Sequence, residues 1–196
     1  TEEKALYTIA FDKENPSALI NAALLARENA RGSRDIISTE LWESINKFYH
    51  FMMTYDREAY QRTHLYDFTQ NAIEKITIIK GKIDGTLIHN QTWCIISLGM
   101  YIERASQILR SIITKLEDIE FLKEGKVKDA IYAHQLAAML RGLESFDMSR
   151  KHYRRALNLP DSLEFLLLNN EFPRSYLYCI YQIAQLIMHI RDVKKI

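Results

Sequence analysis

The stretch NQTWCIISLGMYIERASQILRSIITKL, residues Asn90 to Leu116, decides the fold class. Its apolar residues follow an alternating spacing of three and four: Ile95, Leu98, Ile102, Ala105, Leu109, Ile112 and Leu116. This spacing is typical of a helix whose apolar seam packs against other helices in a bundle. Such a helix would be about 40 Å long at about 1.5 Å per residue, so it needs partners of similar length.

Helical periodicity continues on both sides of this stretch, with turn signals between the periodic segments. We expect about six to seven helices, near residues 16–36, 38–54, 57–83, 90–117, 127–156, 161–168 and 173–191. Helix starts are expected at Asn15-Pro16, at Ser38-Thr39 and at the capping-box-like Asp161-Ser162-Leu163-Glu164. The β-branched run from Ile76 to Ile79 could form a strand, but the helical stripe passes through it, which favours a helix. The sequence thus predicts an all-α, mostly antiparallel helical bundle.

The same spacing predicts which faces turn inward. We expect Leu19, Ala22, Ala26 and Ala30 to face inward on the first helix, and Tyr176, Ile180, Ile183, Ile187 and Ile190 on the last. The second helix should bury Leu41, Ile45, Phe48 and Met52, and the third Leu65, Phe68, Ala72, Ile76, Ile79 and Ile83.

Composition narrows the class of protein further. Six glycines and three prolines in 196 residues are too few for a β-sandwich or barrel, and 47% apolar residues argue against disorder. A net charge of +1 argues against a protein that coats nucleic acid or an anionic membrane. No Gly-, Ser- or Pro-rich linker divides the chain, so residues 1–196 are expected to form one domain. Cys94 and Cys179 lie in apolar stretches and are expected to be free, buried thiols.

Targeting signals and most chemical motifs are absent from the sequence. No secretory signal opens the chain and no apolar run is long enough to cross a membrane, so we expect a cytoplasmic protein. There is no Gly-rich phosphate loop, no His-Glu-x-x-His and no Cys-x-x-Cys. No Glu is followed by His three residues later, which disfavours the di-iron site of some helical bundles. The six histidines are scattered, so neither a metal site nor a cofactor is expected.

A charged set on the first expected helix is the main candidate site. Arg27, Arg31 and Arg34 would share one helix face, with Glu28 and Asp35 on a neighbouring face. Glu103-Arg104, in the middle of the long helix, flank its apolar seam. If these groups meet, they either form an ion-pair network that fixes helix register or hold a carboxylate or phosphate in several Arg forks.

Two further clusters have a structural and a functional interpretation. The basic run from Arg150 to Arg155 is either a solvated helix end or a site for an anion or partner. The aromatic residues Trp42, Phe48, Tyr49 and Phe51 are expected in the core rather than in a binding site.

Three blocks of the sequence resemble the bacterial alpha-E domain family. The first runs from Ala26 to Arg31 and continues through Arg34-Asp35 and the stretch from Glu40 to Asn46; the second is Leu98 to Ala105. The third is Glu164 to Leu168, followed by Glu171-Phe172-Pro173-Arg174-Ser175. The family is an all-helical domain with a Glu-Arg motif, matched here by Glu103-Arg104, and has no established activity.

An earlier Glu-Arg copy that the family usually carries is not found ahead of Asn15, so we expect the chain to lack the N-terminal portion of the domain. Met100, where the family often has Arg, and Asn90-Gln91-Thr92, where an acidic pair is common, are further departures.

The resemblance implies a partner rather than a reaction. Members of the family occur beside or fused to ATP-grasp ligase-like proteins, with transglutaminase-like and Ntn-hydrolase-like proteins nearby. This company implies an accessory module of a peptide or amide ligase system, in which Arg27, Arg31, Arg34, Glu103, Arg104 and Arg174 build a polar core. Two alternatives stay open: a transferase or hydrolase that uses Glu28 or Glu103 as general acid and base, and a structural bundle that self-associates as a homo-oligomer.

Overall fold

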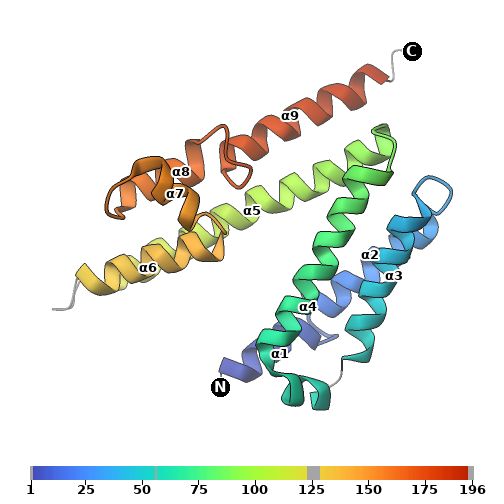
Figure 1. Ribbon diagram of the computed structural model, residues 1–196, viewed down its shortest axis with the longest axis horizontal. Coiled ribbons are helices and arrows are strands. Elements are labelled where there is room, and N and C mark those ends of the chain that lie inside the picture. The colour runs from blue at the N-terminus through green and yellow to red at the C-terminus, as the bar shows by residue number, and fades with distance from the viewer. Residues whose placement is uncertain (1, 56, 123–128, 194–196) are drawn as a thin grey trace. The chain divides into compact units, whose positions relative to one another are not determined.

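The computed structural model describes residues 2–55, 57–122 and 129–193, and these residues form helices and no strand. The helices are α1 (Glu2–Phe11), α2 (Leu19–Gly32), α3 (Thr39–Thr54), α4 (Arg57–Thr86), α5 (Gln91–Leu122), α6 (Asp129–Gly142), α7 (Phe146–Tyr153), α8 (Leu159–Leu168) and α9 (Tyr176–Val193), as Figure 1 shows. The all-α prediction is confirmed. None of the described helices is both long and apolar enough to span a lipid bilayer.

The chain divides into two compact units, Thr1–Trp93 and Cys94–Ile196, and each has its own apolar cluster. That the two units together form the single domain expected for residues 1–196 stays a prediction. The described helices outnumber the expected six to seven for two reasons. Helix α1 matches none of the expected helices, and the helix expected over 127–156 is interrupted.

In the first unit, α2, α3 and α4 fold back on one another, and α1 packs against α2 (Figure 1). An aromatic group fills the space among α1, α3 and α4: Phe11 stacks on Tyr55 at 5.7 Å between ring centroids, and Phe68 lies 4.7 Å from Tyr55 and 5.7 Å from Phe51. The inward faces expected for α3 and α4 are largely confirmed, with Leu41, Phe48, Met52, Phe68, Ala72 and Ile83 buried. The Leu65 side chain lies outside the described residues.

The start of α2 differs from the expectation. Asn15 and Pro16 do not open the helix; the Asn15 side chain accepts a hydrogen bond from the Ser17 amide at 3.1 Å and closes a turn, and α2 begins at Leu19. The helix ends at Gly32, short of the expected 36. At α3 the expected cap is confirmed, because Ser38 Oγ accepts from the Leu41 amide at 3.2 Å.

In the second unit, α5 packs along α6 and α9 over an apolar cluster that includes Ile108, Ile112, Leu136, Leu140 and Cys179 (Figure 1). Both cysteines are free and buried, as predicted, and burial raises the pKa of each thiol. The seam expected for α5 is only half right. Ala105 and Ile112 are buried, but Ile95 and Ile102 are 60% and 48% exposed.

The helix expected over 127–156 is wrong as a single element. Residues 127 and 128 lie outside the described residues, and the rest is divided between α6 and α7 by a turn at Leu143-Glu144-Ser145. The Ser145 amide donates to the Leu140 carbonyl at 2.8 Å and the Glu144 amide to the Arg141 carbonyl at 2.9 Å, with Glu144 left-handed at φ 50°. These bonds form a Schellman motif, which ends α6 and redirects the chain.

Helices α8 and α9 also begin differently from the expectation. Asn158, not Asp161, caps α8, because its side-chain oxygen accepts from the Asp161 amide at 2.9 Å. Helix α9 begins at Tyr176 rather than at 173, after a turn that contains Pro173.

Candidate functional site

The first part of the candidate site is a guanidinium–aromatic cluster between α2 and α3. The Arg27 guanidinium carbon lies 4.6 Å from the ring centre of Tyr49 and 5.9 Å from that of Trp42. Its Nε donates to Asn46 Oδ1 at 2.8 Å, and a terminal nitrogen donates to Glu28 at 3.0 Å. The Arg27 side chain is only 25% exposed, so its ring contacts and hydrogen bonds lie at the packed face of α2.

The remaining charges of this set fall into two groups. The second oxygen of Glu28 accepts from Arg31 at 2.6 Å, so one carboxylate joins two guanidinium groups. Arg34 lies beyond the end of α2, and its guanidinium carbon lies 4.9 Å from the Trp42 ring centre. Asp35 is exposed and makes no ion pair within residues 2–55, 57–122 and 129–193.

The second part of the candidate site is Glu103-Arg104 on α5, and its two residues have different partners. Glu103 is 72% exposed and pairs with Arg110, further along the same helix, at 2.5 Å. Arg104 donates to the backbone carbonyl of Pro173 at 3.1 Å, and its guanidinium carbon lies 5.2 Å from the Tyr101 ring centre. The arginine of the pair therefore connects α5 to the turn before α9, whereas the glutamate stays on the surface of α5.

That turn is held by its own side chains. Asn169 Oδ1 accepts from the amides of Glu171 and Phe172 at 2.9 and 2.8 Å. Ser175 Oγ donates to the Asn169 carbonyl and accepts from the Tyr178 amide at 3.1 Å, so Ser175 is the N-cap of α9. These bonds fix the backbone around Pro173, so the acceptor of Arg104 is already in place.

Arg174, the last residue of the predicted set, pairs with Glu144 at 2.5 Å. Glu144 is the left-handed residue between α6 and α7, so this ion pair ties the turn before α9 to the end of α6. Arg104 and Arg174 thus both hold the same turn, one through a carbonyl and the other through a carboxylate.

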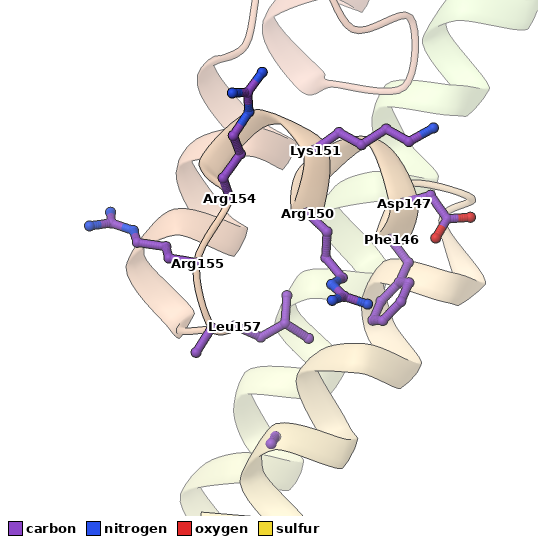
Figure 2. Close-up of a pocket in the computed structure, with 9 residues that line it drawn as sticks. Phe146, Asp147, Arg150, Lys151, Arg154, Arg155 and Leu157 are labelled. Carbon is purple, nitrogen blue, oxygen red and sulfur yellow. The ribbon is translucent and has the colours of Figure 1, made fainter.

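A pronounced cavity in the second unit lies between α6, α7 and residues 154–157 (Figure 2). It has a volume of about 750 Å³ and is lined by Ala133, Phe146, Asp147, Arg150, Lys151, Arg154, Arg155, Ala156 and Leu157. Figure 2 shows the Arg150 side chain directed between Phe146 and Leu157, whereas Arg154 and Arg155 point away. The basic run is exposed around the end of α7, and its Arg150 is directed into this concave surface.

One member of that run is neutralised by a buried carboxylate. Arg155 donates to both oxygens of Asp161, at 2.6 and 2.5 Å, and Asn158 donates to the same carboxylate at 2.7 Å. The hydrogen bond from Arg155 holds the pKa of Asp161 below its ordinary value against the opposing effect of burial.

Of the predicted site residues, the structure brings Arg27, Glu28 and Arg31 together and places Arg34 on the same tryptophan as Arg27. It does not pair Glu103 with Arg104. That the cluster on α2 and α3 meets Glu103-Arg104 stays a prediction. Among the described residues, no three His, Cys, Asp or Glu side chains gather closely enough to hold a metal ion.

Sequence reasoning missed the partners of these residues. Asn46 ends the first block that resembles the family, but its role depends on how α2 faces α3. The partner of Arg104 is a backbone carbonyl, for which no residue type gives a signal.

The fold and the clusters define an all-α protein in which Arg27, Arg104 and Arg174 connect separate elements, whereas Glu28 and Glu103 form ion pairs within their own helices. The chain belongs to the Alpha-E family, described as a predicted alpha-helical domain with a conserved ER motif, and the match covers residues 1–195. The Glu-Arg pair of this chain that fits that description is Glu103-Arg104. No curated protein and no solved structure shows significant similarity to the chain.

Proposed function

We propose that this protein is a non-catalytic accessory module that binds an ATP-grasp-type amide ligase. The observation that carries the proposal is that each candidate acid–base residue already has guanidinium partners. Glu28 accepts from Arg27 with one oxygen and from Arg31 with the other, and Glu103 pairs with Arg110. A general base has to reach a substrate proton, and here it would have to leave these partners first.

The surroundings of the two carboxylates point the same way. Glu103 is 72% exposed, and neither Glu28 nor Glu103 lines the cavity in the second unit. General acid–base catalysis benefits from a site that excludes water, because electrostatic interactions are stronger there. An exposed, paired carboxylate is better suited to stabilising a helix surface than to proton transfer.

The ligase is proposed as the partner because members of the family occur beside or fused to ATP-grasp ligase-like proteins. An accessory module needs a rigid surface, and guanidinium groups that connect α2 to α3 and α5 to the turn before α9 provide rigidity. A transglutaminase-like protein is the other partner that the family's company implies.

The test is co-expression of the tagged chain with the ATP-grasp-type ligase of the same organism, followed by size-exclusion chromatography with light scattering. A parallel co-expression with the transglutaminase-like protein serves as the comparison. We expect a complex with the ligase that persists at about 0.15 M salt. Separate elution of the chain and the ligase would overturn the proposal, and a complex with the transglutaminase-like protein alone would replace the partner.

A further inference from the structure

The cavity between α6, α7 and residues 154–157 has the size of a ligand site. Its volume of about 750 Å³ is within the range of about 300–1,000 Å³ that is usual for small-molecule sites. Its lining combines apolar surface from Ala133, Phe146 and Leu157 with several cationic side chains. An apolar wall with a few polar groups is the usual composition of such sites.

The charge of the lining is positive and largely uncompensated. Arg155 is neutralised by Asp161. Within the part of the chain that the structure describes, Arg150, Lys151 and Arg154 make no ion pair, and the lining contains a single acid, Asp147. Arg150 and Lys151 lie in the last turn of α7, where cations complement the negative end of the helix dipole, and both side chains are exposed. That role does not require a guanidinium group directed between Phe146 and Leu157, which is where Figure 2 shows Arg150.

Arg150 is the cation placed to meet a ligand. Figure 2 shows its guanidinium group beside the Phe146 ring, and its central carbon lies 5.7 Å from the ring centre. The ring and the Leu157 side chain flank it, so an anion held by Arg150 would have apolar surface on both sides. A planar guanidinium group binds carboxylates and phosphates with two parallel hydrogen bonds.

Residues 154–157, which follow α7 and line one side of the cavity, are held in place by hydrogen bonds within the protein. Arg154 adopts a left-handed conformation with φ 53°, and its amide donates to the Arg150 carbonyl at 2.9 Å. This conformation is unfavourable for a residue that has a Cβ. It turns the chain back after α7, and the hydrogen bonds from Arg155 and Asn158 to Asp161 hold the segment that follows. A segment that is already ordered loses less conformational entropy when a ligand binds.

We propose that this cavity binds a small organic anion, a carboxylate or phosphate group carried on an apolar or aromatic body, with Arg150 as its anion-binding residue. The site lies wholly within the second unit. It does not depend on the ligase partnership, so either proposal can fail without the other.

The experiment is isothermal titration of the full chain with four probes. N-acetylphenylalanine and phenyl phosphate carry an anion and a ring, N-acetylphenylalaninamide carries only the ring, and inorganic phosphate carries only the anion. We expect at least one of the first two to bind about tenfold more tightly than either of the last two. Their relative affinities identify the preferred anion. Equal affinity for the amide, or binding by inorganic phosphate alone, would overturn the proposal.

Matched variants locate the site. Arg150→Gln should weaken binding about tenfold, whereas Arg154→Gln, which removes a guanidinium group that points away from the cavity, should change it less than about threefold. Ala133→Phe, at an exposed position of α6 that lines the cavity, fills the space without changing any charge and should also weaken binding. Equal losses in Arg150→Gln and Arg154→Gln, with no loss in Ala133→Phe, would show attraction to surface charge and contradict the assignment. Circular dichroism of each variant confirms that it is folded.

Discussion

Arg27 stands on the buried stripe of α2, in line with Ile20, Ala23 and Ala30. A long, planar cation is suited to this position because its stem packs as an apolar chain while its guanidinium group lies on aromatic rings and donates hydrogen bonds. Here the rings are Trp42 and Tyr49 of α3. The residue therefore takes the place of a core residue in the contact between two helices.

We expect Arg27→Met to lower the free energy of unfolding by about 1–2 kcal/mol, because it removes the ring contacts and the hydrogen bonds to Asn46 and Glu28. Arg31→Gln is the control, since the Arg31 side chain is 65% exposed and its loss should cost less than about 0.5 kcal/mol. Urea unfolding monitored by circular dichroism measures both. Equal effects of the two substitutions would show that the stacked position is not special.

The two residues of the Glu-Arg pair are also expected to contribute unequally to the free energy of unfolding. Arg104→Met removes the hydrogen bond to the Pro173 carbonyl and should cost about 1 kcal/mol, or roughly 2–4 °C in melting temperature. Glu103→Gln breaks only an exposed ion pair with Arg110 and should cost less than about 0.5 kcal/mol. Differential scanning calorimetry of the two single variants decides; a larger effect at Glu103 would contradict the division between the two residues.

Asp161 makes stability depend on acid pH. Its pKa lies below the ordinary value of 3.8 in the folded protein, chiefly because Arg155 hydrogen-bonds to the charged form. The unfolded chain therefore binds the proton first, so this contribution is present at neutral pH and is lost as pH falls below about 4. Melting temperatures measured from pH 6 to pH 2 should fall more steeply for the natural protein than for Asp161→Asn. Parallel curves would contradict the prediction.

At the scale of helices, the sequence predicted elements better than it predicted their faces and ends. Helix α3 was placed correctly, with its Ser38 cap, because a hydroxyl side chain before an amphipathic run is a local signal. The predicted face of α2 was wrong except at Ala30, which is buried, because the helix has alanine and leucine on several sides. Ile20 and Ala23 are buried, whereas Leu19 is 39% exposed. Only the facing aromatic residues of α3 select between such faces.

The break between α6 and α7 was missed for a related reason. Left-handed turns that end helices usually contain glycine, and this one places Glu144 there, so the sequence carries no breaker at the turn itself. On α5 the buried side includes Ser97, which a search for apolar residues passes over in favour of Ile95 and Ile102. On α9 the buried residues are Cys179 and Leu186, beside the expected stripe.

Helix α4 contains Gly81 and Gly85 and continues to Thr86, past the expected end at 83. Gly81 lies inside the helix, is exposed, and has no atom within 4 Å of the position that a Cβ would occupy. Gly81→Ala should therefore raise the free energy of unfolding by about 0.5–1 kcal/mol, since alanine restricts the unfolded chain and favours the helix. Urea unfolding measures the gain. A loss of stability would show that the helix is not continuous at this point.

At the scale of the whole molecule, each unit has its own apolar cluster and its own set of guanidinium contacts. In the first unit these contacts join α2 to α3, and in the second they join α5 and α6 to the turn before α9. The sequence identified Arg27, Arg104 and Arg174 as candidate residues but not their partners, because neither a backbone carbonyl nor a cavity wall has a signature in sequence.

We propose that the charged residues of this protein serve structure and binding rather than catalysis. The decisive experiment measures amide-bond formation by the ATP-grasp-type ligase of the same organism, with and without the chain. We predict that the natural chain and a Glu28→Gln/Glu103→Gln double variant change ligase turnover equally, and that the chain alone forms no product. Turnover by the chain alone that disappears in the double variant would contradict the claim.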